Sequence, residues 1–182
     1  AETFGVLQSF YPNRIELGVG RAPGSDQDTA KALSYPKAIA DIQEFPQQVA
    51  DLVGFLSGTL PDEHIFSHVK SQPGPAPNSI PGIWLLGSSD YSARLAAVLG
   101  LPFSFADFFG TTREQGPTAA AIYRKGFKPS PICPEPKLNV GLQVICAPTK
   151  KEAQFIGASR NINKAREVLR LGLGPGMISP EK

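Results

Sequence analysis

The stretch from Pro81 to Phe109 most constrains how this chain can fold, because it predicts two strands and a helix in immediate succession. Ile83 to Leu86 is a short, continuous apolar run, which is typical of a strand buried on both faces. Apolar residues then recur at helical spacing from Ser92 to Leu99, and Gly100 stops that helix. Phe103 to Ala106 predicts the next strand. The unit is therefore β-α-β, and sequential strands joined in this way normally lie parallel.

Three serines, Ser88, Ser89 and Ser92, cluster where the first of these strands ends and the helix begins. Ligands of α/β folds usually bind at this position. The N–H groups of a first helical turn have no partner within the helix, so they can hold a phosphate. Helix capping is the alternative explanation, because Ser is a preferred N-cap residue. On local chemistry alone, capping is favoured.

The composition indicates one globular domain. The chain has 182 residues, of which 41% are hydrophobic, and this is enough for a sizeable core. Eighteen prolines and 18 glycines indicate many connections between short elements. We expect a single domain over residues 1–182, with a frayed tail at 172–182.

Charge and cysteine usage exclude several classes of protein. Eighteen basic and 16 acidic residues give a net charge of +2, so neither nucleic acid nor an anionic membrane is expected as a partner. Two lone cysteines, Cys133 and Cys146, favour a reduced, cytoplasmic protein. His64 and His68 stand four residues apart, but no third ligand is evident, so no metal site is predicted.

Two further strands are expected outside the central unit. In residues 14–19, alternation places Leu17 and Val19 on one face and Glu16 on the other, but it does not tell which face points inward. Residues 138–146 are apolar and β-branched enough to predict a buried strand. Helices are expected from Ile42 to Leu56, from Pro117 to Lys125 and from 149 to 158, and a basic amphipathic segment from Arg160 to Leu171. Another apolar stripe, of Phe4, Leu7 and Phe10 or Tyr11, predicts a helix at the beginning of the chain.

Arg21 follows the first of these strands directly. The preceding Gly18-Val19-Gly20 resembles part of a dinucleotide-binding fingerprint, but Pro23 stands where a third glycine is needed. A guanidinium at this place could pair with a phosphate through two parallel hydrogen bonds. An ordinary surface arginine is the alternative.

Three ordered blocks of sequence carry a resemblance to a known family. The central block is Trp-Leu-Leu-Gly-Ser-Ser followed by Ser-Ala, Leu-Ala-Ala and Gly-Leu-Pro-Phe, within residues 84–103. A second runs from Tyr11 to Gly24, and a third comprises Tyr123-Arg124 with Phe127 to Ser130. Together they resemble the bacterial luciferase-like family of flavin-dependent monooxygenases.

The resemblance implies an α/β fold that is part of a (β/α)8 barrel. The four expected strands, at 14–19, 83–87, 103–106 and 138–146, resemble the fourth to seventh barrel strands. A missing barrel fragment or a homo-oligomer is therefore expected to cover the open strand edges and the apolar faces of Phe103, Phe105, Leu142 and Val144.

The resemblance also implies a cofactor, reduced FMN, and places its phosphate. By motif position the phosphate contacts fall on Arg21 and on the turn Gly87, Ser88, Ser89 and Ser92. Light-emitting members have a carboxylate where this chain has Ser88, which favours the plainer oxidoreductases. The family's active-site histidine is matched by neither His64 nor His68, so the catalytic residues stay unassigned.

The implied function is that of a flavin-dependent monooxygenase or oxidoreductase that uses reduced flavin and O2 on a small organic substrate. The flavin would supply the oxygen chemistry, and a flavin reductase would supply the reduced flavin. Activity is expected only when the missing barrel portion is present. Two alternatives stay open: a shortened relative that binds flavin or phosphate without catalysis, and a structural remnant without a ligand.

Overall fold

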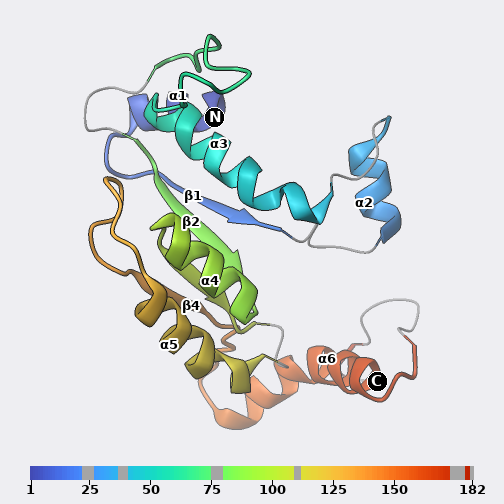
Figure 1. Ribbon diagram of the computed structural model, residues 1–182. Coiled ribbons are helices and arrows are strands. Elements are labelled where there is room, and N and C mark those ends of the chain that lie inside the picture. Colours follow the sequence, from blue (N-terminus) through green and yellow to red (C-terminus); the bar gives the residue numbers. More distant parts are fainter. Residues whose placement is uncertain (22–26, 37–40, 75–79, 109–111, 173–178, 181–182) are drawn as a thin grey trace. The chain divides into compact units, whose positions relative to one another are not determined.

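Four parallel strands form one sheet and pair in sequence order, β1-β2-β3-β4 (Figure 1). The computed structural model describes residues 1–21, 27–36, 41–74, 80–108, 112–172 and 179–180. The strands are β1 (Glu16–Gly20), β2 (Gly82–Gly87), β3 (Phe103–Ala106) and β4 (Leu138–Gly141). Helices stand between successive strands, as parallel neighbours require. The predicted α/β class with four parallel strands is confirmed.

Six α-helices accompany these strands in the described part of the chain. They are α1 (Glu2–Phe10), α2 (Gln27–Ser34), α3 (Phe45–Ser57), α4 (Asp90–Leu99), α5 (Gly116–Gly126) and α6 (Lys150–Val168). Short 3-10 turns, Ile42–Glu44 and Arg113–Gln115, lead into α3 and α5. The contacts group the chain into two compact units, Ala1–Leu142 and Gln143–Lys182, and α6 lies in the second. A single domain stays a prediction, and most of the expected frayed tail lies outside the described residues.

One face of the sheet carries the hydrophobic core. Its side chains alternate along the strands, as the period of a β-strand requires. The buried sheet residues on this face are Leu17, Ile83, Leu85, Phe103 and Phe105. They share one cluster with Phe45, Val49 and Leu56 of α3, Ala93, Ala96 and Ala97 of α4, and Ala119 and Tyr123 of α5. Helices α3, α4 and α5 therefore pack on this face of the sheet (Figure 1).

The opposite face of the sheet is richer in small and polar residues. Glu16 lies there, because Leu17 next to it points into the core, and this decides the face that alternation alone left open. Strand pairing aligns one row across this face, Gly20, Leu86, Ser104 and Asn139.

Strand β4 is shorter and more exposed than predicted. The sequence predicted a buried strand over 138–146, but β4 ends at Gly141. Its partner β3 has only four residues, Phe103–Ala106, and each of them is already paired with a residue of β4. The chain beyond β4 therefore has no ladder to join, and Val144 is 80% exposed.

Three further expectations need correction. Phe103 and Phe105 need no partner chain, because the chain's own helices bury them. In α1 only Phe4 of the predicted stripe packs against the core, whereas Phe10 is 73% exposed. The two segments expected at 149–158 and 160–171 form one continuous helix, α6. At its start the backbone N–H of Glu152 donates a hydrogen bond to Thr149 Oγ1.

The Tyr123 hydroxyl links α5 to the residues that lead into β3 and β4. It donates to the Leu101 carbonyl at 2.9 Å and accepts from the Lys137 N–H at 3.1 Å. The side chain is fully buried, and burial raises the pKa of Tyr123 to about 12 from an ordinary 10.0. The neutral phenol is therefore the form that the fold holds.

Replacing Tyr123 by Phe should lower the free energy of unfolding by about 1–3 kcal/mol, because the buried Leu101 carbonyl and the part-buried Lys137 N–H lose their hydrogen-bond partner. A raised pKa in the folded state gives stability that is present below about pH 10 and is lost as the pH rises through about 12. The Phe variant has no phenol at position 123, so it should not show this loss of stability at alkaline pH. Urea unfolding at several pH values measures both effects. Tyr11→Phe, on an exposed tyrosine, is the control and should change little.

We expect the chain to self-associate at micromolar concentration. In the described residues, β1 and β4 are edge strands, and Leu142 just after β4 is 62% exposed. Unpaired edges and exposed apolar side chains favour pairing with another copy. Sedimentation velocity should show a species larger than a monomer that dissociates on dilution. A compact monomer at every concentration would contradict this expectation.

Candidate functional site

Parallel pairing brings the ends of β1 and β2 to the same edge of the sheet. Gly20, the last residue of β1, pairs with Leu86, the penultimate residue of β2. Arg21 and Gly87 therefore both follow at the carboxyl edge of the sheet. Helix α4 begins at the same edge, because only Ser88 and Ser89 separate Gly87 from its first residue.

Arg21 contacts the first turn of α4 directly. Its guanidinium carbon lies 4.5 Å from the ring centroid of Tyr91, the second residue of the helix. This is a cation–π contact at close range. The structure thus joins Arg21 to the helix terminus that carries the serines. Sequence reasoning singled out Arg21 and the serines but missed Tyr91, since an aromatic residue in a first helical turn carries no signal of its own.

The serine hydroxyls are not used for capping. Ser89 is the N-cap residue of α4, with an extended backbone (φ −139°, ψ 168°), but its side chain makes no capping hydrogen bond. Capping, the alternative favoured on local chemistry, is therefore wrong for Ser89. The hydroxyls of Ser88, Ser89 and Ser92 have no hydrogen-bond partner among the described residues. The first turn of α4 keeps N–H donors that no side chain satisfies.

Gly87 and Ser92 are packed against each other. A Cβ at position 87 would collide with Cβ and Oγ of Ser92. Ser92 itself is only 8% exposed. The turn between β2 and α4 therefore depends on the missing side chain of Gly87, which lets the helix start close to the strand end.

The one carboxylate in the first turn of α4 has a cationic neighbour of its own. Asp90 Oδ2 lies 3.7 Å from Nε of Arg94, one helical turn further on. Both side chains are exposed, so the pair contributes little stability. The pair instead reduces the negative charge at the helix start, because a carboxylate beside Arg94 repels an anion there less than an unpaired carboxylate would.

This edge of the sheet offers donors for an anion. Arg21 brings a full positive charge, the start of α4 brings N–H groups and the positive end of the helix dipole, and three serines bring hydroxyls. A phosphate monoester fits this donor set. No comparable set for a metal exists in the described ranges, which hold no group of three or more His, Cys, Asp or Glu side chains suited to one.

His64 lies in the loop after α3 rather than at this edge of the sheet. Nε2 of His64 is 3.3 Å from Oδ1 of Asp51 in α3, and its Nδ1 accepts from the N–H of Phe66 at 3.2 Å. Both ring nitrogens of His64 thus have partners within the loop and the neighbouring helix. This arrangement holds the loop after α3 in place.

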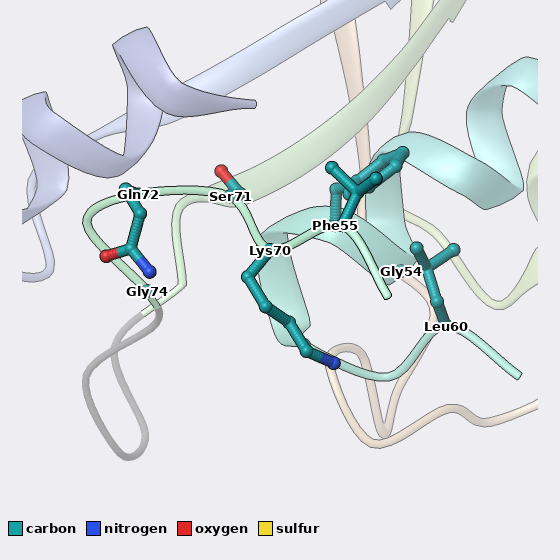
Figure 2. A pocket seen from close by; sticks show the side chains of 9 residues that line it. Gly54, Phe55, Leu60, Lys70, Ser71, Gln72 and Gly74 are labelled. Carbon is teal, nitrogen blue, oxygen red and sulfur yellow. The ribbon is translucent and has the colours of Figure 1, made fainter. Parts of the chain in front are cut away.

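A cavity of about 190 Å³ lies between the end of α3 and the loop before β2 (Figure 2). It is lined by Gly54, Phe55, Gly58, Leu60, Val69, Lys70, Ser71, Gln72 and Gly74. Lys70 is its one titratable lining residue, and the Nζ of Lys70 donates to the Ser67 carbonyl. No group of reactive side chains converges there, so the carboxyl edge of the sheet is the better candidate site.

Two groups with shifted acidity lie in the core rather than at this edge. Burial raises the pKa of Cys133 above its ordinary value, as it does for Tyr123. A thiol with a raised pKa is a poor nucleophile. Neither group therefore takes part in the candidate site. Among the described residues, no helix is both long and apolar enough to cross a membrane.

Comparison with known proteins shows what the chain is similar to. A family model described as "Luciferase-like monooxygenase" matches residues 1–156. A luciferase-like monooxygenase of Escherichia coli (strain K12) is 45% identical over 159 residues, which are 87% of this chain and 45% of that protein. The N-acetyl-S-alkylcysteine monooxygenase of Bacillus subtilis (strain 168) is 35% identical over 156 residues, or 85% of this chain and 44% of that protein.

A solved structure agrees with these sequence matches. The crystal structure of apo-MsnO8 superposes with a TM-score of 0.75 at 31% identity and covers 93% of this chain and 48% of that one. The chain therefore spans about half the length of the relatives it matches. Its sheet of four parallel strands is the partial barrel that the resemblance implied.

Substituting Gly87 by Ala should distort the turn, because the added Cβ collides with Ser92. We expect a loss of about 1–3 kcal/mol in the free energy of unfolding, measured with urea. Gly18→Ala is the control, since a Cβ there meets nothing within 4 Å. Ser92→Gly should recover part of the loss when it is combined with Gly87→Ala. Equal stability of Gly87→Ala and Gly18→Ala would show that the turn tolerates a side chain.

Proposed function

Because the chain belongs to the family of luciferase-like monooxygenases, we propose that it is the phosphate-binding part of an FMN-dependent monooxygenase. The protein would use reduced FMN and O2 on a small organic substrate. The relative named N-acetyl-S-alkylcysteine monooxygenase supports this class of reaction.

One observation carries the proposal: Arg21 lies against Tyr91, at a helix terminus whose N-cap side chain makes no capping bond. A cation, free N–H groups and free hydroxyls at one place are the donor set of a phosphate site. The place of these donors also supports a ligand site, because ligands of parallel α/β folds bind at the carboxyl ends of the strands.

Each group has a distinct role in this proposal. The Arg21 guanidinium would hold the phosphate through charge-assisted hydrogen bonds, and the N–H groups at the start of α4 would donate to it as well. Ser88 and Ser89 add neutral hydrogen bonds, whereas Ser92 also packs against Gly87 and shapes the turn. The bound flavin supplies the oxygen chemistry, and the chain's own residues orient it and hold its phosphate.

The remaining parts of the function lie outside this chain. It spans 45% of the Escherichia coli relative, so we propose that further barrel strands cover the face with Leu86, Ser104 and Asn139 and complete the substrate pocket. A flavin reductase would supply reduced FMN. The two free cysteines support a cytoplasmic location.

A second candidate function is binding without catalysis. The donors of the proposed phosphate site all belong to this chain, whereas the described residues contain no assigned catalytic group. A shortened flavin- or phosphate-binding relative would therefore show the same FMN affinity but no turnover with reduced FMN and O2.

Arg21→Ala should weaken FMN binding more than Ser89→Ala does, because a charge-assisted hydrogen bond is stronger than a neutral one. We expect a rise in Kd of about 10- to 150-fold for Arg21→Ala, against about two- to tenfold for Ser89→Ala. Fluorescence titration with FMN measures both changes against the parent chain.

Riboflavin, which lacks the phosphate, is the internal control. It should bind weakly to the parent chain and be indifferent to both substitutions. If FMN bound equally well to all three proteins, its phosphate would have to lie elsewhere.

A further inference from the structure

Arg21 is an exposed side chain immediately after the end of a strand. An arginine in such a place can adopt many rotamers, and ordering it on a ligand costs conformational entropy. Here the contact with Tyr91 restricts it, since the guanidinium carbon lies 4.5 Å from the ring centroid. The Tyr91 side chain is half-buried, so the ring is a firmer support than a free surface residue would be.

A ring face is well suited to hold an arginine without consuming its donors. The cation–π contact is electrostatic and occupies no N–H of the guanidinium. A carboxylate partner would hold Arg21 too, but it would also neutralise the charge that a phosphate needs. Among the described residues no carboxylate forms an ion pair with Arg21, and neighbouring Asp90 is paired with Arg94 instead.

We propose that Tyr91 is a positioning residue for the phosphate site. Its ring holds the Arg21 guanidinium beside the first turn of α4, so that the cation and the helix N–H groups face one phosphate together. This inference rests on the proposed function, because it names the residue that organises the same site. Tyr91 acts through Arg21, and its hydroxyl is not needed.

The test replaces Tyr91 by Leu and, separately, by Phe, and measures the Kd for FMN. Tyr91→Leu removes the ring face but keeps apolar bulk, and should raise the Kd about three- to tenfold. Tyr91→Phe keeps the ring face and should bind like the parent chain. Riboflavin affinity should be the same in all variants, because the effect is exerted on the phosphate alone. Circular dichroism and urea unfolding check that each variant is folded.

A double-mutant cycle shows whether Tyr91 works through Arg21. The variant carrying both Arg21→Ala and Tyr91→Leu should bind FMN no more weakly than Arg21→Ala alone, because without the guanidinium the ring has nothing to position. The same four proteins can be compared by their free energies of urea unfolding without flavin. The two substitutions should again be non-additive, which reports the contact between Arg21 and Tyr91 independently of any ligand.

The outcomes separate the two claims. If the parent chain bound FMN no better than riboflavin, the proposed function would fail, and the role of Tyr91 at a phosphate would fail with it. If the parent bound FMN and Arg21→Ala weakened binding, but Tyr91→Leu did not, only the positioning role would be wrong. It would also be wrong if Tyr91→Phe lost as much affinity as Tyr91→Leu, or if the two losses were additive.

Discussion

The parallel pairing of β1 with β2 is the constraint on which the candidate site depends. Five register pairs, from Glu16 with Gly82 to Gly20 with Leu86, fix how far each strand extends toward the carboxyl edge. Because the side-chain period of a strand is two, a shift by one residue would also turn Leu17 out of the core. The burial of Leu17 and Ile83 on the helix-covered face therefore also determines where Arg21 emerges. Arg21 then lies within reach of the helix that follows β2.

The helix start depends on a second, more local constraint. Gly87 lets Ser92 pack against the end of β2, and α4 begins only three residues after that strand ends. Alanines at three positions of α4 are buried against the sheet, so the helix lies close to the strands that it follows. Its first turn thereby stays at the edge of the sheet, where the ring of Tyr91 contacts Arg21. Stability and the candidate function thus share the same short turn.

Much of the fold could be predicted from the sequence, because its elements have strong local signals. The apolar run at Ile83 to Leu86 and the stop at Gly100 gave β2 and the end of α4 almost as the structure has them. The length of β4 could not be predicted in this way, because it is limited by β3, its partner in the sheet. The face of Glu16 likewise depends on which side the helices cover.

The candidate site was predictable only in part. Its residue types and its place after two strands followed from sequence and family resemblance, since Arg and Ser are common phosphate ligands. The role of Ser89 did not follow: a serine at an N-cap is expected to cap, and here it does not. The contact between Arg21 and Tyr91 could not be predicted either, because it joins residues 70 positions apart that meet only through strand pairing.

The central claim is that the phosphate of FMN binds at the start of α4. Amide chemical shifts of the ¹⁵N-labelled chain test it most directly, because each N–H reports on its own hydrogen bond. FMN should shift the amides of Asp90, Tyr91 and Ser92 most strongly, and riboflavin at equal concentration should leave them unchanged. Shifts that were confined to another part of the chain, or that were the same with both flavins, would contradict the account.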